Sequence, residues 1–169
     1  MFSKRGIAAT RVEDILVAAK IARRTFYRYF ASKEEVLAAL YEVMTAELVK
    51  GIEQQNAGSP LAGIRAGIDA YLAFYRASPR ALRELVELAI RSDSLLAPRR
   101  RWLREQIVRL LDEAVQSLDG RRLDPLLYYA LVSALEGLSL EITTGSDVER
   151  ARTVVHTLID RVLGLKGDG

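Results

Sequence analysis

Three arginines, a threonine and a tyrosine lie within six consecutive positions near the N-terminus, in the stretch Arg23-Arg-Thr-Phe-Tyr-Arg28. On a helix, Arg23 and Tyr27 are neighbours, and so are Arg24 and Arg28, because residues four apart share a face. Guanidinium groups can clamp phosphates or read guanine edges, and hydroxyl groups can donate hydrogen bonds to phosphate oxygens. Lys33 follows in the first turn of the next expected helix, where the positive helix end favours a phosphate. The pattern predicts a surface that contacts a polyanion.

The charge distribution supports an anionic partner for this region alone. The 169-residue chain has a net charge of +3. Residues 1–33 hold eight Lys/Arg against two acids, a charge of +6, whereas the other 136 residues hold 17 against 20, a charge of −3. A basic head on a mildly acidic body indicates that the head carries the binding surface.

Two short helices, at about 11–18 and 22–30, must position these side chains. The residues between them, 19–21, form the turn of a helix-turn-helix, whose second helix enters the DNA major groove. Apolar side chains four apart should face inward: Ala22, Phe26 and Phe30 are expected to pack on Val12, Ile15 and Leu16. The alternative from the residues alone is a solvated basic face over a small helical core.

Helix start signals recur along the rest of the chain. Thr10 with Glu13, Ser32 with Glu35, and Ser146 with Glu149 fit the capping box, in which a hydroxyl and a carboxylate satisfy unpaired backbone N–H groups. Ser59-Pro60, Ser78-Pro79 and Asp124-Pro125 place a cap residue before a proline at the first helical position. No segment alternates with period two for long enough to predict a strand. The fold class is therefore all-α, with further helices expected at 33–55, 60–77, 79–91, 99–118, 125–143 and 147–163.

Several classes of protein are excluded by what the chain contains. It has no cysteine and one histidine, His156, which leaves no disulfide, thiolate nucleophile or cluster of metal ligands. Glu136 and Glu141 are the only notable carboxylates on an apolar helix, and their spacing turns them about 140° apart. We expect no enzyme activity, no metal and no cofactor. No apolar run approaches the roughly 18 residues of a membrane helix, and no signal peptide is recognised, so we expect a cytoplasmic protein without a membrane partner.

Two features of the body, residues 34–169, indicate binding surfaces. Helix 125–143 is apolar almost all round and must be buried on both sides. The intervening helices carry apolar and phenolic side chains suited to a small-molecule pocket: the candidates are Met44, Tyr71, Phe74, Tyr75, Trp102, Ile107, Leu111 and Tyr128. Plain core packing is the alternative for each of them. The stretch from Arg99 to Arg104 could contact nucleic acid, but a solvated face or an acidic ligand fits it better.

The head resembles a known family. Thr10-Arg-Val-Glu-Asp-Ile15, Thr25-Phe-Tyr-Arg-Tyr-Phe30 and Ser32-Lys33 are similar to the DNA-binding head of the TetR family of bacterial transcriptional regulators. The resemblance implies that Thr25, Tyr27 and Lys33 contact the DNA backbone and that Thr10 caps a helix near it. It also implies that Arg23, Arg24 and Arg28 meet bases or phosphates.

Three departures from the family pattern affect the head. Members usually have a full helix before the glycine that matches Gly6, so we expect the first helix to be truncated here. Lys20 replaces the turn glycine, and a left-handed conformation there would cost about 1 kcal/mol. Ala22 replaces the usual serine cap, a loss of roughly 1 kcal/mol. These changes should weaken the head locally.

The resemblance also implies a function. A helix-turn-helix head, residues 1–33, would bind a palindromic operator in double-stranded DNA, and residues 34–169 would bind a largely apolar effector and form a homodimer. The last two helices would pair with their twins through Leu127, Leu131, Ala134, Leu138, Val155, Leu158, Ile159 and Val162. We therefore expect a ligand-responsive regulator, usually a repressor. The alternatives are a single large core inside a monomer and a dimeric all-α module that binds ligands or proteins but has lost specific DNA binding.

Overall fold

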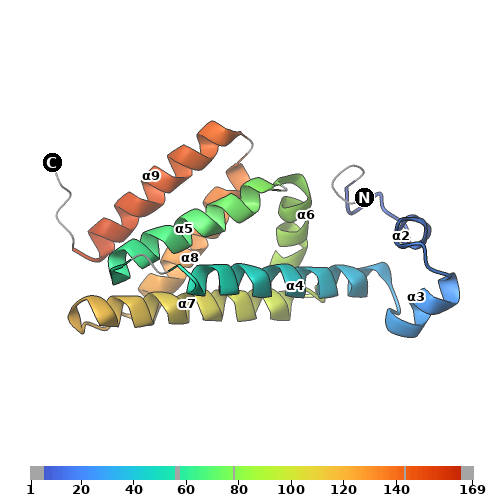
Figure 1. The fold of residues 1–169 in the computed structure, drawn as a ribbon, viewed down its shortest axis with the longest axis horizontal. Coiled ribbons are helices and arrows are strands. Elements are labelled where there is room, and N and C mark those ends of the chain that lie inside the picture. The colour runs from blue at the N-terminus through green and yellow to red at the C-terminus, as the bar shows by residue number, and fades with distance from the viewer. Residues whose placement is uncertain (1–5, 56–57, 78, 143, 165–169) are drawn as a thin grey trace. The chain divides into compact units, whose positions relative to one another are not determined.

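The computed structural model describes residues 6–55, 58–77, 79–142 and 144–164, except for the side chains of residues 77 and 79–82. Within these ranges the fold is all-α, as predicted (Figure 1). The helices are α2 (Val12–Ala19), α3 (Arg23–Tyr29), α4 (Lys33–Glu53), α5 (Pro60–Ala77), α6 (Pro79–Ile90), α7 (Ala97–Asp119), α8 (Pro125–Glu141) and α9 (Gly145–Val162). Each of them begins and ends within two residues of the predicted bounds. No helix in the described part of the chain is long and apolar enough to cross a membrane.

The chain divides into two compact units. Unit 1 comprises residues 1–45 and 80–101, and unit 2 comprises residues 46–79 and 102–169. Helices α4 and α7 each contribute to both units. The functional boundary expected after residue 33 falls inside unit 1 and stays a prediction.

Unit 1 is built around a small apolar core under the head. Leu37, Ala38 and Tyr41 of α4 pack with Leu85 and Ala89 of α6, and the core also includes Ile7 and Leu96. Arg99 Nε lies 2.9 Å from Glu42 Oε2, which joins the start of α7 to α4.

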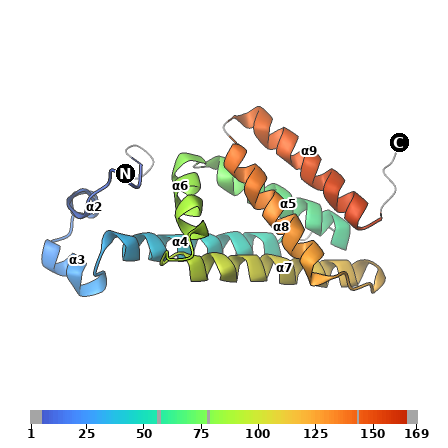
Figure 2. The ribbon, with the colours of Figure 1, turned by 180° about the vertical axis from the view of Figure 1, so that it is seen from behind.

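In unit 2, α9 packs against both α5 and α8 (Figure 2). Its buried stripe includes Val148, Ala151, Val155 and Ile159, residues that recur at the three- and four-residue intervals of one helical face. Ion pairs flank this packing: Arg65 Nη2 lies 2.8 Å from Asp160 Oδ1, and Arg152 Nε lies 2.9 Å from Asp69 Oδ1.

Three predicted helix starts use the cap residues expected. Ser32 Oγ accepts a hydrogen bond from the Glu35 N–H, and Ser59 Oγ accepts one from the Ala62 N–H. The Asp124 carboxylate accepts from the Leu126 N–H at 2.9 Å. Ser78, by contrast, lies outside the described residues.

Two predicted capping boxes are wrong. Helix α2 begins one residue after Arg11, whose N–H donates to Asp14 Oδ2, so Glu13 is not its capping partner. Helix α9 is capped by Thr144, which forms the capping box with Asp147. The box is therefore not formed by the predicted pair, Ser146 and Glu149. In both cases an aspartate sits at the third helical position, and its shorter side chain serves the same purpose as glutamate.

Candidate functional site

The basic face of α3 is held outward by one buried aromatic ring. Phe26 is 1% exposed and packs at the centre of the head, where its ring contacts those of Tyr27 and Phe30. Burying a phenylalanine side chain contributes about 1.5–3 kcal/mol. Ile15 of α2 is also buried, as predicted. The inward position predicted for Ala22 is wrong, because this residue is the N-cap of α3 and is exposed.

The outward face carries the predicted side chains. Arg23, Arg24, Tyr27 and Arg28 are all exposed, and Thr25 on the flank is half-buried. Tyr27 keeps half of its surface exposed, at 50%. The arrangement gives three guanidinium groups and a phenol on one side of a seven-residue helix, which can bond phosphates or base edges.

Two residues that the sequence reasoning did not assign to the site contact these arginines. Glu13 on α2 pairs with Arg23, so this guanidinium has an intramolecular partner that phosphate must replace. Tyr29 accepts a hydrogen bond from Arg28 Nη2 at 3.0 Å, and its ring lies 4.8 Å from the Arg28 guanidinium carbon. The signal for Tyr29 was its place next to Arg28 in the basic stretch.

Thr10 and Lys33 lie in a different setting from the exposed arginines. Thr10 is 1% exposed, and its hydroxyl donates to the Gly6 carbonyl at 2.7 Å. Lys33 Nζ donates to the Ile7 carbonyl at 3.1 Å, while the Ile7 N–H donates to Glu84 on α6. These bonds fix the backbone that enters α2, so in this structure both side chains support the head from within unit 1.

The turn between α2 and α3 has the conformation expected from the sequence. Lys20 adopts the left-handed region with φ of 55° and is the only described non-glycine residue with positive φ. The Ile21 N–H closes the helix end by donating to the Leu16 carbonyl at 3.1 Å. Ala22, the N-cap of α3, makes no side-chain cap hydrogen bond. Helix α3 therefore starts without a side-chain cap, and the turn before it contains no glycine.

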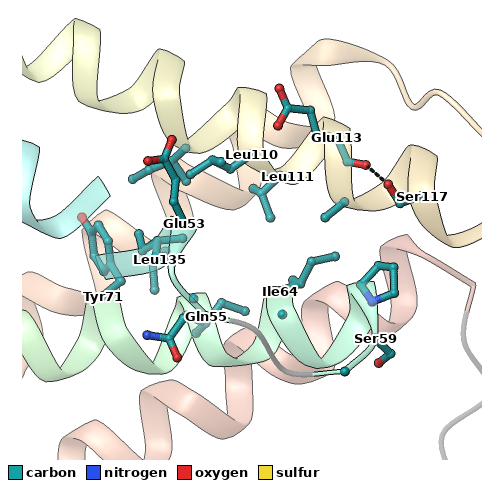
Figure 3. A pocket seen from close by; sticks show the side chains of 18 residues that line it. Glu53, Gln55, Ser59, Ile64, Tyr71, Leu110, Leu111, Glu113, Ser117 and Leu135 are labelled. Atoms are coloured by element: carbon teal, nitrogen blue, oxygen red, sulfur yellow. Dashed lines mark hydrogen bonds between the residues drawn. The ribbon is translucent and has the colours of Figure 1, made fainter. Parts of the chain in front are cut away.

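Unit 2 contains a cavity of about 460 Å³ between the end of α4 and helices α5, α7 and α8 (Figure 3). Three of the eight predicted ligand residues line it: Tyr71, Ile107 and Leu111. The volume falls in the range of small-molecule sites. Sequence reasoning missed the contributions of Ile64, Gly63 and the loop at Gln55, which depend on tertiary packing.

The other five predicted ligand residues lie elsewhere. Tyr75 is buried and stacks on Tyr71 with ring centroids 4.9 Å apart, and Phe74 packs edge-on against Tyr75. Tyr128 donates to Asp112 Oδ1 at 3.1 Å, and burial together with this bond raises the pKa of the phenol. Met44 packs on the core of unit 1, and Trp102 is 40% exposed.

The predicted interface residues divide between surface and core. Leu127 and Leu158 are exposed at 41% and 37%, and Leu131, Ala134, Leu138 and Val162 are half-buried. Val155 and Ile159 are buried within the protomer. The outward side of α8 also exposes small residues, Ala130, Ser133 and Gly137.

Comparisons with known proteins find likenesses both for the head and for the fold as a whole. The family model "Bacterial regulatory proteins, tetR family" matches residues 1–40, which contain α2, α3 and the start of α4. Solved TetR-type regulators share the fold over nearly the whole chain. Residues 1–40 thus match a TetR-type head, and the described chain has the fold of solved TetR-family transcriptional regulators.

Individual relatives show how far the likeness extends. The HTH-type transcriptional regulator YerO of Bacillus subtilis (strain 168) is 36% identical over 63 residues, a match that spans 36% of this chain and only 22% of that protein. The TetR family transcriptional regulator PfmR from Thermus thermophilus has a TM-score of 0.67 at 25% identity, covering 95% of this chain and 92% of that one. The fatty acid degradation regulator FadR from Bacillus halodurans has a TM-score of 0.76 at 22% identity, covering 96% and 89%.

Proposed function

We propose that the protein is a homodimeric, ligand-responsive DNA-binding regulator that acts as a repressor on a palindromic operator. The observation that carries the proposal is the outward face of α3, where Arg24, Tyr27 and Arg28 are exposed around the buried anchor Phe26. DNA is recognised by basic and hydroxyl side chains on such a helix in the major groove. A chromosomal operator implies that the protein works in the cytoplasm.

Lys33 and Thr10 are proposed to serve this surface in two ways. Thr10 holds the Gly6 carbonyl and so stabilises the entry to α2. Lys33 bonds the Ile7 carbonyl at the first residue of α4, and its ammonium could exchange that partner for a DNA phosphate, because charged partners form the stronger hydrogen bond.

Dimerisation is proposed to use the exposed sides of α8 and α9. Leu127 and Leu158 provide apolar surface there, and the small side chains of Ala130 and Gly137 let a partner helix approach closely. Two-fold symmetry of the dimer matches a palindromic operator. Val155 and Ile159 would support this face from the protomer core.

The cavity of unit 2 is the proposed effector site. It includes Ile52 and Glu53 in the last turn of α4, the helix that begins at Lys33 beside the head. A ligand that binds one position of α4 better than another shifts the population of DNA-binding states. A second hollow, of about 530 Å³ in unit 1, is lined by five charged side chains among its eleven residues and suits an apolar effector less well.

A mobility-shift titration with DNA upstream of the protein's own gene tests the proposal. The wild-type protein should give a salt-sensitive shift, and the double variant Arg24→Ala/Arg28→Ala should lose it. Arg76, an exposed arginine at the end of α5, provides the matched control. A folded dimer that selects no DNA sequence would instead support a module that binds only ligands or proteins.

A further inference from the structure

The cavity of unit 2 has apolar walls whose few polar groups already have partners. Leu111 of α7 faces Ile64 of α5 across it (Figure 3), and Leu110, Ile68 and Leu135 extend the same surface. The Tyr71 hydroxyl donates to the Tyr75 hydroxyl at 3.2 Å, and the Ser117 hydroxyl donates to the Glu113 carbonyl at 2.8 Å. A ligand would therefore be held mainly by apolar contact.

The charged residues that line the cavity are all acidic. Among the described residues that line it there is no lysine, arginine or histidine, and the two charged ones are Glu53 and Glu113. Both carboxylates are exposed, and that of Glu113 points away from the apolar interior (Figure 3). The rim is thus acidic and the interior is uncharged.

The arginine that contacts this rim is already engaged. Arg109 Nη2 lies 2.9 Å from Glu53 Oε1, and Arg109 Nη1 lies 3.0 Å from Glu113 Oε1. One guanidinium between two carboxylates leaves a net charge of −1. A ligand anion could recruit Arg109 only by breaking these bonds and leaving both carboxylates beside the anion.

We propose that this cavity binds an uncharged apolar molecule more tightly than a molecule with the same hydrocarbon chain that ends in a carboxylate. The inference rests on the proposed function, since it names the class of effector for that site. An anion entering the cavity would lose hydration without gaining a counter-ion and would meet the repulsion of Glu53 and Glu113. A neutral ester or alcohol end would incur neither penalty.

The direct test compares two probes with the same acyl chain, the neutral ester methyl decanoate and the anion decanoate, by calorimetric titration of the full-length protein below the concentrations at which either probe aggregates. The ester should bind with a dissociation constant at least about tenfold lower than that of the carboxylate. The variant Ala114→Leu places a larger side chain in the cavity wall and should abolish ester binding.

A second pair of variants tests the role of the rim. Glu53→Gln/Glu113→Gln should bring the two dissociation constants closer together by raising carboxylate affinity. Glu105→Gln, an exposed glutamate on α7 that does not line the cavity, should leave the ratio unchanged.

Three results would overturn the inference: carboxylate binding as tight as ester binding, an ester affinity untouched by Ala114→Leu, or no binding of either probe. The assay contains no DNA, so its failure is separate from failure of the mobility-shift experiment. If the protein retards DNA in the mobility-shift assay but binds both probes equally, the proposed regulatory function stands and the preference for a neutral ligand is wrong. A protein that selects the ester but ignores DNA keeps the selectivity and loses the proposed regulatory role.

Discussion

At the scale of single residues, the proposed DNA contact of the head depends on a few exposed side chains and on the buried side chain that positions them. Arg24 and Arg28 are exposed on α3, and Phe26 between them is buried. Each phosphate neutralised by an arginine releases counter-ions, so the salt dependence of binding reports how many such contacts form. The number of phosphate contacts that these arginines make can therefore be measured.

Replacing Arg24 with alanine should weaken DNA binding and reduce the slope of log K against log salt by roughly 1, if the guanidinium contacts a phosphate. Arg28→Ala should have a similar effect on affinity. Fluorescence anisotropy over a range of salt concentrations measures both quantities, with Arg76→Ala as the control. An unchanged slope and affinity in both head variants would contradict the assignment of this face to DNA.

Lys20 offers a second residue-scale test because it carries positive φ. Lys20→Gly should raise the free energy of unfolding by about 0.5–1 kcal/mol, since glycine adopts the left-handed region without the Cβ penalty. Urea denaturation measures the change. Lys20→Ala removes the same charge but keeps a Cβ, so an equal gain in that variant would show that charge, and not backbone strain, is the cause.

The contact between Glu84 and the backbone of Ile7 should stabilise unit 1. Glu84→Ala removes the acceptor of the Ile7 N–H, and Ile7 is 3% exposed, so unfolding should become easier by about 1–3 kcal/mol. Thermal or urea unfolding provides the measurement. Glu87→Ala, on the exposed side of the same helix, should change stability by much less; similar losses in the two variants would argue against a specific role for Glu84.

At the scale of helices, close packing of α4 on α5 leaves little room for a side chain at Gly67, whereas Gly51 faces open space. A Cβ at Gly67 would lie 3.1 Å from the Ile52 Cγ2, whereas a Cβ at Gly51 would meet nothing within 4 Å. Gly51→Ala should therefore stabilise the protein by about 0.5–1 kcal/mol through helix propensity. Gly67→Ala should gain less or lose stability, and a larger gain there than at residue 51 would contradict the packing described. Urea unfolding of both variants gives the comparison.

Helix positions were predictable because their signals are local. Ser59 and Asp124, each followed by a proline, mark helix starts at which few other residues could act as the cap. The apolar periodicity of α9 is also a local signal, because it can be read within one helix. Cap partners were less certain because several side chains compete for one N–H group. The hydroxyl of Thr10 bonds to Gly6 instead of the helix start, which no spacing rule indicates.

The site was only partly predictable for a related reason. Exposure of Arg24, Tyr27 and Arg28 follows from the helical period around Phe26. The cavity does not, because its walls come from four helices and a loop whose packing is not encoded in local pattern. Aromatic side chains such as Tyr75 and Tyr128 fill the core around the cavity. Residue type alone therefore could not distinguish residues that line the cavity from residues that pack in the core.

At the scale of the whole molecule, the proposed dimer needs the outward sides of α8 and α9. The double variant Leu127→Arg/Leu158→Arg should give a folded monomer in analytical ultracentrifugation, because buried like charges oppose association. Val43→Arg, at an exposed apolar position on α4, is the control and should leave the wild-type state unchanged. A dimer that tolerates both arginines would place the interface elsewhere.

The most direct test of the central claim is selection of DNA by the full-length protein from a random pool, followed by anisotropy titration of the enriched duplex. We predict enrichment of a palindrome whose half-sites are separated by about one helical turn, roughly 10–10.5 base pairs, or a multiple of it. Binding should fall steeply with salt and should be lost in Arg24→Ala/Arg28→Ala. No enriched sequence, or enrichment that survives this double variant, would contradict the assignment of the α3 face as the surface that reads DNA.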